Sequence, residues 1–576
     1  MKILVLSLLR IGDIVLSAPV LRGLRERYPD AEIHLLINSQ FRQIASLLPY
    51  IDRVIPFERD RLQKGLGDAN VAIFDSYDRL NETVDQLNFE NYDWTINLTH
   101  NRLSGWMMNL INAKERSGLC FDHQGRATFG SSWFRYLNNQ VDSDGDEVFH
   151  YSDVFRFALG LVDEASAHTQ KSGLVETVKG RTEAEEFLDM TFSTAPARKE
   201  LIAVQVLTSD SKKDWGLERF QQALVHMGRQ HPNAGFAILS APFERERLMP
   251  FVEDLVASGV NAHLAVLSFE GAFSLLRKAR LLLTGDTSVK HLACAARTPI
   301  VEISLGSSDL HRTGAYLHGA VIIQSRETCA PCVHSKPCHR DTHACSVRIS
   351  PELVSMIAGE VFTGRGFQLK TIAEEFKTEA EIYRVDTRSA GFWAPYSVRE
   401  SFTEVSVGRW INRACRKIWL ESMARGRSGD SMGTEILKIS RLLRVIHHDI
   451  SEIEWRHLFS EFERQALSVE GRINSFKVGL SYLCGCYEDP RKMKEFVRSL
   501  ISFRERIRLA PLLRSYKLAL DEVIEDDISP AFTSFKRMSD LVTEIEKRTA
   551  IHLRLIRGLG QSDSSGIGSS KGSEKV

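Results

Sequence analysis

Short apolar runs alternate with amphipathic segments along the first part of the chain. The runs "KILVLSL", "EIHLLIN", "RVIPF" and "DWTINL" predict buried strands, and "APVLRGLRERY", "FRQIASLL" and "LSGWMMNLIN" between them predict helices. This alternation requires right-handed crossovers and predicts a parallel sheet covered by helices on both faces. We therefore expect residues 1–165 to form an N-terminal α/β domain.

The same alternation restarts after a region of weaker signals. The runs "LIAVQVL", "GFAILSA", "AHLAVL", "LLLTGD" and "PIVEIS" predict strands, separated by segments such as "LERFQQALVHMGRQ" and "GAFSLLRKAR" that predict helices. Residues 166–365 are expected to form a second domain. The predicted fold class is therefore α/β, with two Rossmann-like domains in tandem.

The pattern changes after the predicted helix "SPELVSMIAGEVF". Residues 366–408 are interpreted as a linker and residues 409–558 as an all-helical domain, in which "EILKISRLLRVI" places apolar side chains at helical spacing. The Gly/Ser-rich residues 559–576 have little to bury and are expected to be disordered.

Composition excludes some classes of function. The chain has 576 residues, 43% of them apolar, and its 74 basic residues balance 74 acidic ones, so several domains are expected and no global positive field is available to attract nucleic acid. Arg10 and Asp13 interrupt the apolar N-terminus, which argues against a signal peptide and for a cytoplasmic protein. The basic segment "RWINRACRKIWLESMARGR" is compatible with peripheral contact at the inner face of the cytoplasmic membrane, although a solvated helix face is the favoured interpretation.

Candidate chemistry follows the predicted strands, because open α/β sheets bind ligands at the carboxyl ends of their strands. Gly12 and Asp13 follow the first strand, where an Asp can equally serve as a helix cap. In the second domain, the loop "LTSDSKKDW" offers the hydroxyls of Thr208, Ser209 and Ser211 and the cation of Lys213 to phosphate oxygens, or is an ordinary solvated turn.

Two further loops carry candidates. In "LSAPFERER", Glu244 or Glu246 can accept hydrogen bonds from ribose hydroxyls, although a solvent-facing charge at a helix start is the more common explanation. After "LLLTG", a turn of Asp286, Thr287 and Ser288 opens a helix whose first N–H groups and dipole can hold a diphosphate, and His291 lies about one turn further along.

Taken in order, the "GD" loop, the "K-x-W" motif and "DTSVKHLACAARTP" resemble glycosyltransferase family 9, the bacterial ADP-heptose heptosyltransferases of lipopolysaccharide assembly. The resemblance covers roughly residues 1–360 and implies a B-type glycosyltransferase fold in which the second domain holds the nucleotide sugar. It departs from the family at Ser288, where Gly is usual, and at "SSDLHRTG", which replaces a Pro-containing phosphate turn.

The resemblance also implies residue roles. Asp13 matches the catalytic base that deprotonates the acceptor hydroxyl for an inverting displacement, on the acceptor-side loop with Gly12. Lys213 matches the lysine that neutralises the departing diphosphate. The remaining matches are to donor-binding positions: Thr208 and Ser209 beside Lys213, Glu244 at the nucleoside, Asp286, Thr287 and Ser288 at the diphosphate and sugar, and His291 nearby.

The implied function is transfer of heptose or a related sugar from a nucleotide donor such as ADP-heptose to a glycan, lipid-linked or protein acceptor. A positioned base and a helix N-terminus with one lysine can perform this chemistry, so no catalytic metal is expected. The alternatives are a non-catalytic interaction module, which would not need all of these residues, and a nucleotide-sugar epimerase, which would need more acid/base groups in the cleft.

Four cysteines occur close together in "CAPCVHSKPCHRDTHAC". The thiols of Cys329, Cys332, Cys338 and Cys345 can form a tetrahedral sulfur site, and their spacing differs from that of nucleic-acid fingers. A structural zinc or iron is favoured over unliganded thiols, and similar loops occur in the related autotransporter heptosyltransferases, where the ion is iron. The additional candidate ligands are the nearby histidines His334, His339 and His343.

Overall fold

The computed structural model describes residues 1–62, 73–139, 149–161, 173–192, 195–332, 337–338, 340, 343–364, 366, 368–387 and 392–399, together with Ser460, Arg464 and Leu467. Residues Met1–Glu400 form one compact unit and Ser401–Val576 a second one. The predicted helical domain at 409–558 and tail at 559–576 lie outside the described residues, apart from the three isolated positions.

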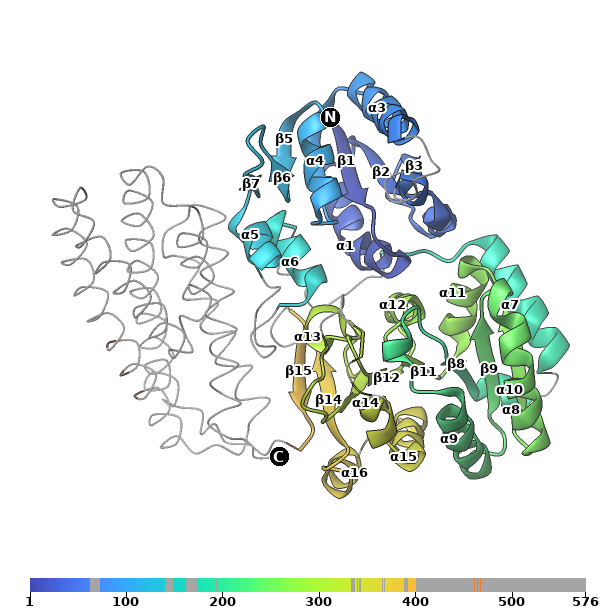
Figure 1. Cartoon of the computed structure of the whole chain (residues 1–576). Coiled ribbons are helices and arrows are strands. Elements are labelled where there is room, and N and C mark those ends of the chain that lie inside the picture. Colours follow the sequence, from blue (N-terminus) through green and yellow to red (C-terminus); the bar gives the residue numbers. More distant parts are fainter. Residues whose placement is uncertain are drawn as a thin grey trace, which may run out of the picture. The chain divides into compact units, whose positions relative to one another are not determined.

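The first sheet has five parallel strands in the order β3-β2-β1-β4-β5 (Figure 1). This is the strand order of a mononucleotide-binding half with one further strand, so the predicted Rossmann-like domain is confirmed. Its strands are β1 (Lys2–Ser7), β2 (Glu32–Asn38), β3 (Arg53–Phe57), β4 (Tyr92–Asn97) and β5 (Ala113–Ser117), with a small hairpin of β6 (Cys120–Phe121) and β7 (Ala127–Thr128). Its helices are α1 (Ile11–Arg27), the 3₁₀ helix η1 (Ser39–Leu47), α3 (Ile73–Phe89), α4 (Arg102–Leu110), α5 (Ser132–Asn139) and α6 (Tyr151–Ala158).

The second sheet has eight strands in the order β10-β9-β8-β11-β12-β13-β14-β15. The strands are β8 (Leu201–Gln205), β9 (Gly235–Ser240), β10 (Ala262–Val266), β11 (Leu281–Gly285), β12 (Ile300–Ser304), β13 (Val321–Ser325), β14 (Ala380–Asp386) and β15 (Ala394–Ser397). The first six are parallel and repeat the Rossmann order, which confirms the second predicted domain. The last two strands are antiparallel.

Helices and short 3₁₀ turns connect these strands. In chain order they are α7 (Val178–Thr191), α8 (Ala195–Lys199), η3 (Ser211–Lys213), α9 (Leu217–Gln230), η4 (Pro242–Glu244), α10 (Arg245–Ala257), α11 (Phe269–Lys278), α12 (Ser288–Ala296), α13 (Leu310–Thr313), α14 (Ala344–Arg348), α15 (Pro351–Thr363) and α16 (Leu369–Glu375). The prediction of a linker over 366–408 is wrong. This segment forms α16 and the strands β14 and β15, which extend the second sheet because Ile382 and Val385 are buried there.

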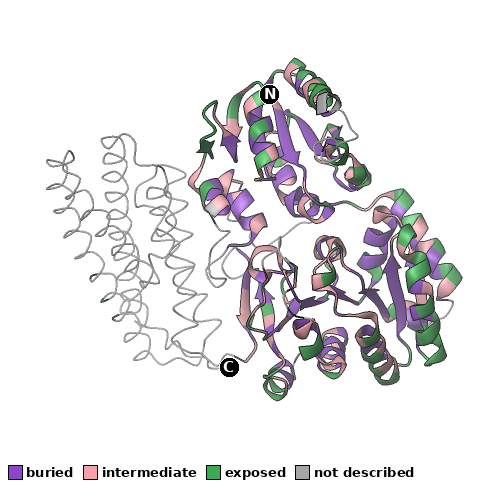
Figure 2. Cartoon of the chain, in the orientation of Figure 1, coloured by how far each residue is buried: buried purple, intermediate pink, exposed green. Residues whose placement is uncertain are grey.

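Apolar side chains from the strands and from the helices that cover them form the hydrophobic cores. One core joins strands β8, β9, β11 and β12 to α9, α10 and α15, with Phe220, Leu248 and Ile357 essentially inaccessible to solvent. Figure 2 shows the strands buried and the outward helix faces exposed. In the part of the chain that the structure describes, no helix is both long enough and apolar enough to cross a membrane.

Helix α6 ties the two sheets together. The buried carboxylate of Asp153 accepts hydrogen bonds from the Tyr316 hydroxyl (2.5 Å) and from the main-chain N–H of Trp393 (2.8 Å). The indole N–H of Trp393 in turn donates to the carbonyl of Ala315 (2.9 Å). Because Trp393 precedes β15, the segment predicted as a linker helps to hold the first domain against the second.

Candidate active site

The carboxyl ends of β1 and β11 meet across the two domains, where α1 packs against α12. A side chain on Gly12 would place its Cβ 3.0 Å from Cδ2 of His291, so the helices approach closely because Gly12 has no side chain. This contact brings the loop of Asp13 from the first sheet to the helix that begins at Ser288 in the second. The sequence predicted these two regions separately, and the tertiary structure brings them together.

Asp13 is both a helix cap and a poised carboxylate. It occupies the third position of α1, and the main-chain N–H of Arg10 donates to its Oδ2 (3.0 Å). Burial raises the pKa of Asp13 above its ordinary value, and the negative charge of Asp286 raises it further, against the opposing effects of Arg10 and Lys213. The capping interpretation of Asp13 therefore holds together with its position in the site.

Four charged residues, of which Lys290 and Glu302 are buried, form a chain behind this carboxylate. Lys213 Nζ donates to Asp286 Oδ2 (2.6 Å), and Lys290 Nζ donates to Asp286 Oδ1 (2.5 Å). Lys290 also donates to Glu302 Oε1 (2.8 Å), while the other Glu302 oxygen accepts from the main-chain N–H of Ala315 (2.8 Å). The side chains of Lys290 and Glu302 are 0% and 1% exposed, and two cations balance two anions.

The charge states follow from burial and pairing. Burial favours the neutral form of Asp286, but the charges of Lys290 and Lys213 outweigh it and hold the pKa of Asp286 well below its ordinary value. Burial likewise lowers the pKa of Lys290, and the attraction of Asp286 and Glu302 outweighs it, so the pKa is raised. Both groups are charged at neutral pH, and Asp286 holds two lysines rather than offering its carboxylate to a phosphate.

Helix α12 starts as predicted, with Thr287 as its N-cap, whose Oγ1 accepts from the main-chain N–H of Lys290 (3.4 Å). His291 is 6% exposed, and its Nδ1 is buried without a hydrogen-bond partner in the described part of the chain. Burial lowers the pKa of His291 to about 3, and the charge of Lys290 adds to this, so the imidazole is neutral.

The remaining predicted donor residues lie on the second domain. Thr208 Oγ1 donates within its own loop, to the carbonyl of Asp210 (2.7 Å) and to Asp214 Oδ1 (2.9 Å), whereas Ser209 is exposed. Glu244 Oε2 accepts from the main-chain N–H of Ala241 (2.8 Å), so its other carboxylate oxygen is the one that could bind a ligand. Glu246 is exposed.

The cysteine loop lies behind the Lys213 loop. Burial raises the pKa of Cys332, and the charges of Cys329, Cys345 and Cys338 raise it further. The main-chain N–H of Cys332 donates to the carbonyl of Gly306 (2.7 Å). Gly306 has φ +58°, and a Cβ there would lie 2.1 Å from the carbonyl oxygen of Lys212, so the cysteine loop and the loop of Lys213 pack back to back through Gly306.

Sequence reasoning missed several residues of this site. Lys290 stands four residues after Asp286, a spacing at which two opposite charges on a helix can pair, and Glu302 is a charge inside the apolar run "PIVEIS". Both features of the sequence could have identified these residues. Arg312 Nε pairs with Asp309 (2.9 Å), and the charge of Asp286 acts on the pKa of Asp309. Burial raises the pKa of Tyr151, and the charge of Asp13 adds to this rise. Arg312 and Asp309 belong to "SSDLHRTG", where the sequence departs from the family's phosphate turn.

Comparisons with known proteins show which family and which structures this chain resembles. Residues 82–342 match the family model described as glycosyltransferase family 9 (heptosyltransferase). The lipopolysaccharide heptosyltransferase 3 of Escherichia coli is 21% identical over 303 residues, which cover 52% of this chain and 81% of that protein.

Two solved structures are similar in fold. The family 9 glycosyltransferase of Veillonella parvula DSM 2008 has a TM-score of 0.47 and 20% identity, over 63% of this chain and 97% of its own. The ADP-heptose lps heptosyltransferase II of E. coli has a TM-score of 0.45 and 16% identity, over 64% of this chain and 100% of its own. Residues 82–342 of the chain are therefore similar to glycosyltransferase family 9, the heptosyltransferase family.

Proposed function

We propose that the chain transfers a heptose or a related sugar from a nucleoside-diphosphate donor, with ADP-heptose as the first candidate, to an acceptor hydroxyl with inversion at the anomeric carbon. One observation carries the proposal. Gly12, next to Asp13 on α1 of the first domain, packs against His291 and Ser288 of α12, the helix that follows Asp286 in the second domain. A base and a leaving-group cation are thus assembled from two domains around one site.

Asp13 acts as the general base. The N–H of Arg10 holds one carboxylate oxygen, which fixes the orientation of the group and leaves the second oxygen for the acceptor hydroxyl. Its raised pKa makes it a better proton acceptor than an ordinary aspartate. Attack of the deprotonated hydroxyl forms the new glycosidic bond and breaks the bond to the diphosphate.

Lys213 and the N-terminus of α12 stabilise the leaving diphosphate. One N–H of Lys213 is held by Asp286, which orients the ammonium group and leaves two N–H donors for phosphate oxygens. Asp286 is in turn held by the buried Lys290, so the cation cannot swing away when the cleft is empty. These positioned charges stabilise developing negative charge without reorganisation.

The nucleoside and sugar contacts are assigned by position. Glu244 follows β9 and would accept hydrogen bonds from ribose hydroxyls, while Thr208, Ser209, Thr287 and Ser288 would line the phosphate path. The neutral His291 lies beside Gly12 and the start of α12, where it would contact the donor sugar.

The cysteine loop fits a structural metal, zinc or iron. Cys329, Cys332, Cys338 and Cys345 supply the four thiolates that a tetrahedral sulfur site needs, and Nε2 of His343, two residues before Cys345, is buried without a hydrogen-bond partner among the described residues. His334 and His339 lie outside the described residues. A bound ion would hold Cys332, and through Gly306 the Lys213 loop, in place. The chemistry of the cleft is assigned to Asp13 and Lys213.

The acceptor is a glycan, lipid-linked or protein hydroxyl, and the site is expected to work in the cytoplasm, with peripheral contact at the inner face of the membrane. The basic segment around Trp410 that motivates membrane contact lies outside the described residues.

Paired substitutions test the proposal. Asp13→Asn keeps the cap and the shape but removes the proton acceptor, so transfer should fall by roughly two to four orders of magnitude while ADP binding is unchanged. Lys213→Ala should weaken ADP binding as well as transfer. ADP-induced thermal shift and transfer from ADP-heptose are the two readouts.

The matched controls are Asp30→Asn, an exposed aspartate just beyond α1, and Lys278→Ala, a surface lysine in an ion pair. Both should behave like the wild type. Near wild-type transfer by Asp13→Asn would place the base elsewhere, and the absence of any nucleotide-induced stabilisation of the wild type would reject the donor assignment.

A further inference from the structure

The loop that follows β12 carries an arginine, Arg312, to which the proposed function assigns no role. In the second sheet, β11 lies between β8 and β12, and the three strands are parallel, so their carboxyl ends share one edge. The loops after β8 and β12 therefore flank the turn of Asp286 that opens α12. The first of these loops supplies Lys213, and the second supplies Arg312 on the short helix α13. The N-terminus of α12 thus has a loop with a cationic residue on each side.

The loop after β12 packs directly on the loop of Lys213. A Cβ on Gly306 would collide with the carbonyl oxygen of Lys212, so the two backbones are in contact. The hydroxyl of Ser307 also donates to Asp210 Oδ2 (3.3 Å) in the loop after β8. These contacts fix the start of the loop of Arg312 against the side of the site that is proposed to hold the leaving group.

The other end of the same loop is fastened to the first domain. Helix α13 ends at Gly314, whose carbonyl accepts from Nε2 of His150, the N-cap of α6 (3.0 Å). Two residues later, the hydroxyl of Ser152 donates to the carbonyl of Leu16 in α1 (3.1 Å). Because α1 carries the proposed base, Arg312 belongs to a segment that connects the leaving-group side of the site with the helix of the base.

An aspartate orients Arg312, as another one orients Lys213. Arg312 Nε lies 2.9 Å from Asp309 Oδ2, and Asp309 Oδ1 accepts from the main-chain N–H of His311 (3.0 Å). The side chains of Arg312 and Asp309 are 20% and 18% exposed, so the pair is largely shielded but still reaches solvent. Lys213 is held in the same manner by Asp286. A guanidinium has five N–H donors in one plane, so an arginine that is already paired can still bind a phosphate.

Buried polar atoms on α12 and in the loop after β12 lack partners. The side chain of Ser308 is 3% exposed, and its hydroxyl has no hydrogen-bond partner in the part of the chain that the structure describes. The same is true of Nδ1 of His291 among these residues. Buried polar atoms are nearly always hydrogen-bonded, so two unpaired ones on adjacent elements indicate a ligand that supplies the missing partners.

We propose that Arg312 is a second cation for the departing diphosphate and that its guanidinium binds the β-phosphate from the side opposite Lys213. The sugar is attached to the β-phosphate and must face the base on α1, and the loop of Arg312 is the one that reaches α6 and α1. When the bond between the anomeric carbon and the β-phosphate oxygen breaks, its electron pair stays on this oxygen, and the N–H groups of Arg312 stabilise the added charge. The inference rests on the proposed glycosyl transfer and adds a residue to it.

The direct test compares two nucleotides that differ in the β-phosphate. ADP and AMP are titrated into the full chain by isothermal titration calorimetry. Arg312→Gln should weaken ADP binding by about ten- to hundredfold, the range expected for lost hydrogen bonds to a charged group, and should leave AMP binding nearly unchanged. Transfer from ADP-heptose should slow by about two to three orders of magnitude. Arg312→Lys keeps the charge without the planar fork, so its ADP affinity should lie between those of Arg312→Gln and the wild type, also if Arg312→Gln folds poorly.

Asp309→Asn distinguishes phosphate binding from a purely structural ion pair. Asparagine can still accept from the N–H of His311, so the start of α13 is kept, while the negative charge beside Arg312 is removed. ADP should then bind at least as tightly as to the wild type, which is the opposite of the effect of Arg312→Gln. If the pair only stabilises the fold, both variants should lower the melting temperature alike and neither should change the ratio of ADP to AMP affinity. That result would refute the inference.

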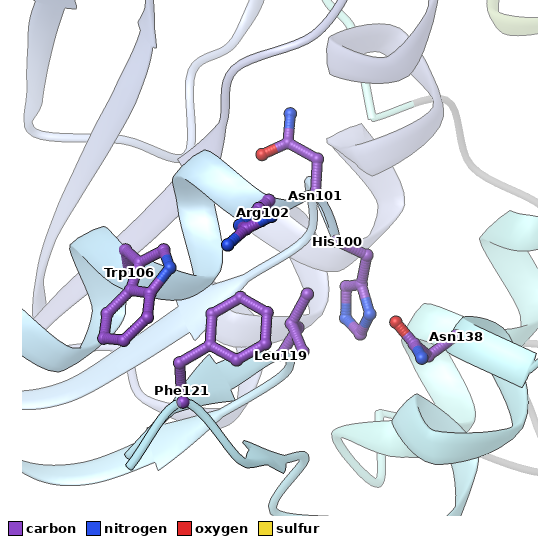
Figure 3. Close-up of a pocket in the computed structure, with 8 residues that line it drawn as sticks. His100, Asn101, Arg102, Trp106, Leu119, Phe121 and Asn138 are labelled. Carbon is purple, nitrogen blue, oxygen red and sulfur yellow. The ribbon is translucent and has the colours of Figure 1, made fainter. Parts of the chain in front are cut away.

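Two arginines of the first domain serve as controls. Arg126 Nε lies 2.8 Å from Asp122 Oδ2, nearly the same separation as in the pair of Arg312, between the strands β6 and β7. Arg102 lines a cavity of about 410 Å³ to which neither Arg312 nor Lys213 contributes (Figure 3). Arg126→Gln and Arg102→Gln should therefore leave ADP and AMP binding unchanged.

The outcomes separate this inference from the proposed function. If the wild type binds ADP and Arg312→Gln binds ADP equally well, Arg312 has no role at the diphosphate and the donor proposal still stands. If Arg312→Gln weakens ADP and AMP binding by the same factor, Arg312 does not act on the β-phosphate, and the inference is again overturned. Absence of ADP binding to the wild type would reject the donor assignment and this inference with it.

Discussion

Replacement of the buried Lys290 by methionine tests whether the ion network holds the donor side of the site. Lys290 is 0% exposed and bonds Asp286 and Glu302, so Lys290→Met leaves two buried carboxylates that each lose a cationic partner. Breaking a buried ion pair on one side costs about 3–5 kcal/mol. Even the lower value corresponds to roughly two orders of magnitude in the unfolding equilibrium, because each 1.4 kcal/mol is about tenfold.

The chain contains a matched control for burial. Lys278 Nζ lies 2.6 Å from Glu185, nearly the same separation as in the Lys290–Asp286 pair, but these side chains are 34% and 43% exposed. Exposed ion pairs contribute about 0.2–1 kcal/mol, so Lys278→Met should cost no more than that. The two lysines form ion pairs of nearly the same length, but they differ in solvent access and in the number of carboxylates they bind, which is two for Lys290 and one for Lys278.

Urea denaturation followed by circular dichroism gives the free energy of unfolding of both variants, with an unchanged m-value as the check that the transition is comparable. Lys290→Met with Glu302→Gln should recover part of the loss, because glutamine can still accept from Ala315 and carries no charge. If Lys290→Met costs as little as Lys278→Met, the network does not stabilise the fold and the argument for its positioning role fails.

Three further predictions concern the cleft and the cysteine loop. Transfer should fall at acid pH with a midpoint above 3.8, because the pKa of Asp13 is raised, and Asp13→Asn should not destabilise the protein at neutral pH, since a buried charge is removed. Gly12→Ala should reduce transfer much more than stability, because its methyl group would lie 3.0 Å from the ring of His291. Purified protein should contain about one zinc or iron per chain by elemental analysis, and Cys332→Ser should lower that content and weaken ADP binding less than Lys213→Ala does.

Each of these has a result that contradicts it. The sign for Asp13 follows from linkage: a carboxyl whose pKa is raised in the native state contributes less to stability as the pH rises, so a loss of more than about 1 kcal/mol in Asp13→Asn at pH 7 would refute the burial argument. Gly359→Ala is the control for Gly12→Ala, because its added Cβ meets its nearest neighbour at an ordinary 3.4 Å. If purified protein contains no metal and is fully stable, the hypothesis of a structural metal ion is refuted.

Local patterns predicted most of the architecture. Buried parallel strands are continuous apolar runs, so β1, β2, β4, β8, β9, β11 and β12 were visible in the sequence, and the loops after them carried Asp13, Lys213 and Asp286. The sequence patterns do not reveal that residues 369–397 belong to the second domain, because the strands of this segment are antiparallel and lie at the edge of the sheet. The partner of β14, β13, lies more than 50 residues earlier in the chain, and local patterns do not show this pairing.

What the sequence determined by itself is the order of strands and helices and the residue types at the strand ends. Only the tertiary structure decided that Lys290 pairs with Asp286 and Glu302, that Gly12 meets His291, and that His100 and Trp106 line one cavity. The physical reason is that backbone preferences and hydrophobic periodicity act over a few residues. Charge pairing and close packing depend on distances between segments that are far apart in the chain, and those distances exist only once the two sheets have come together.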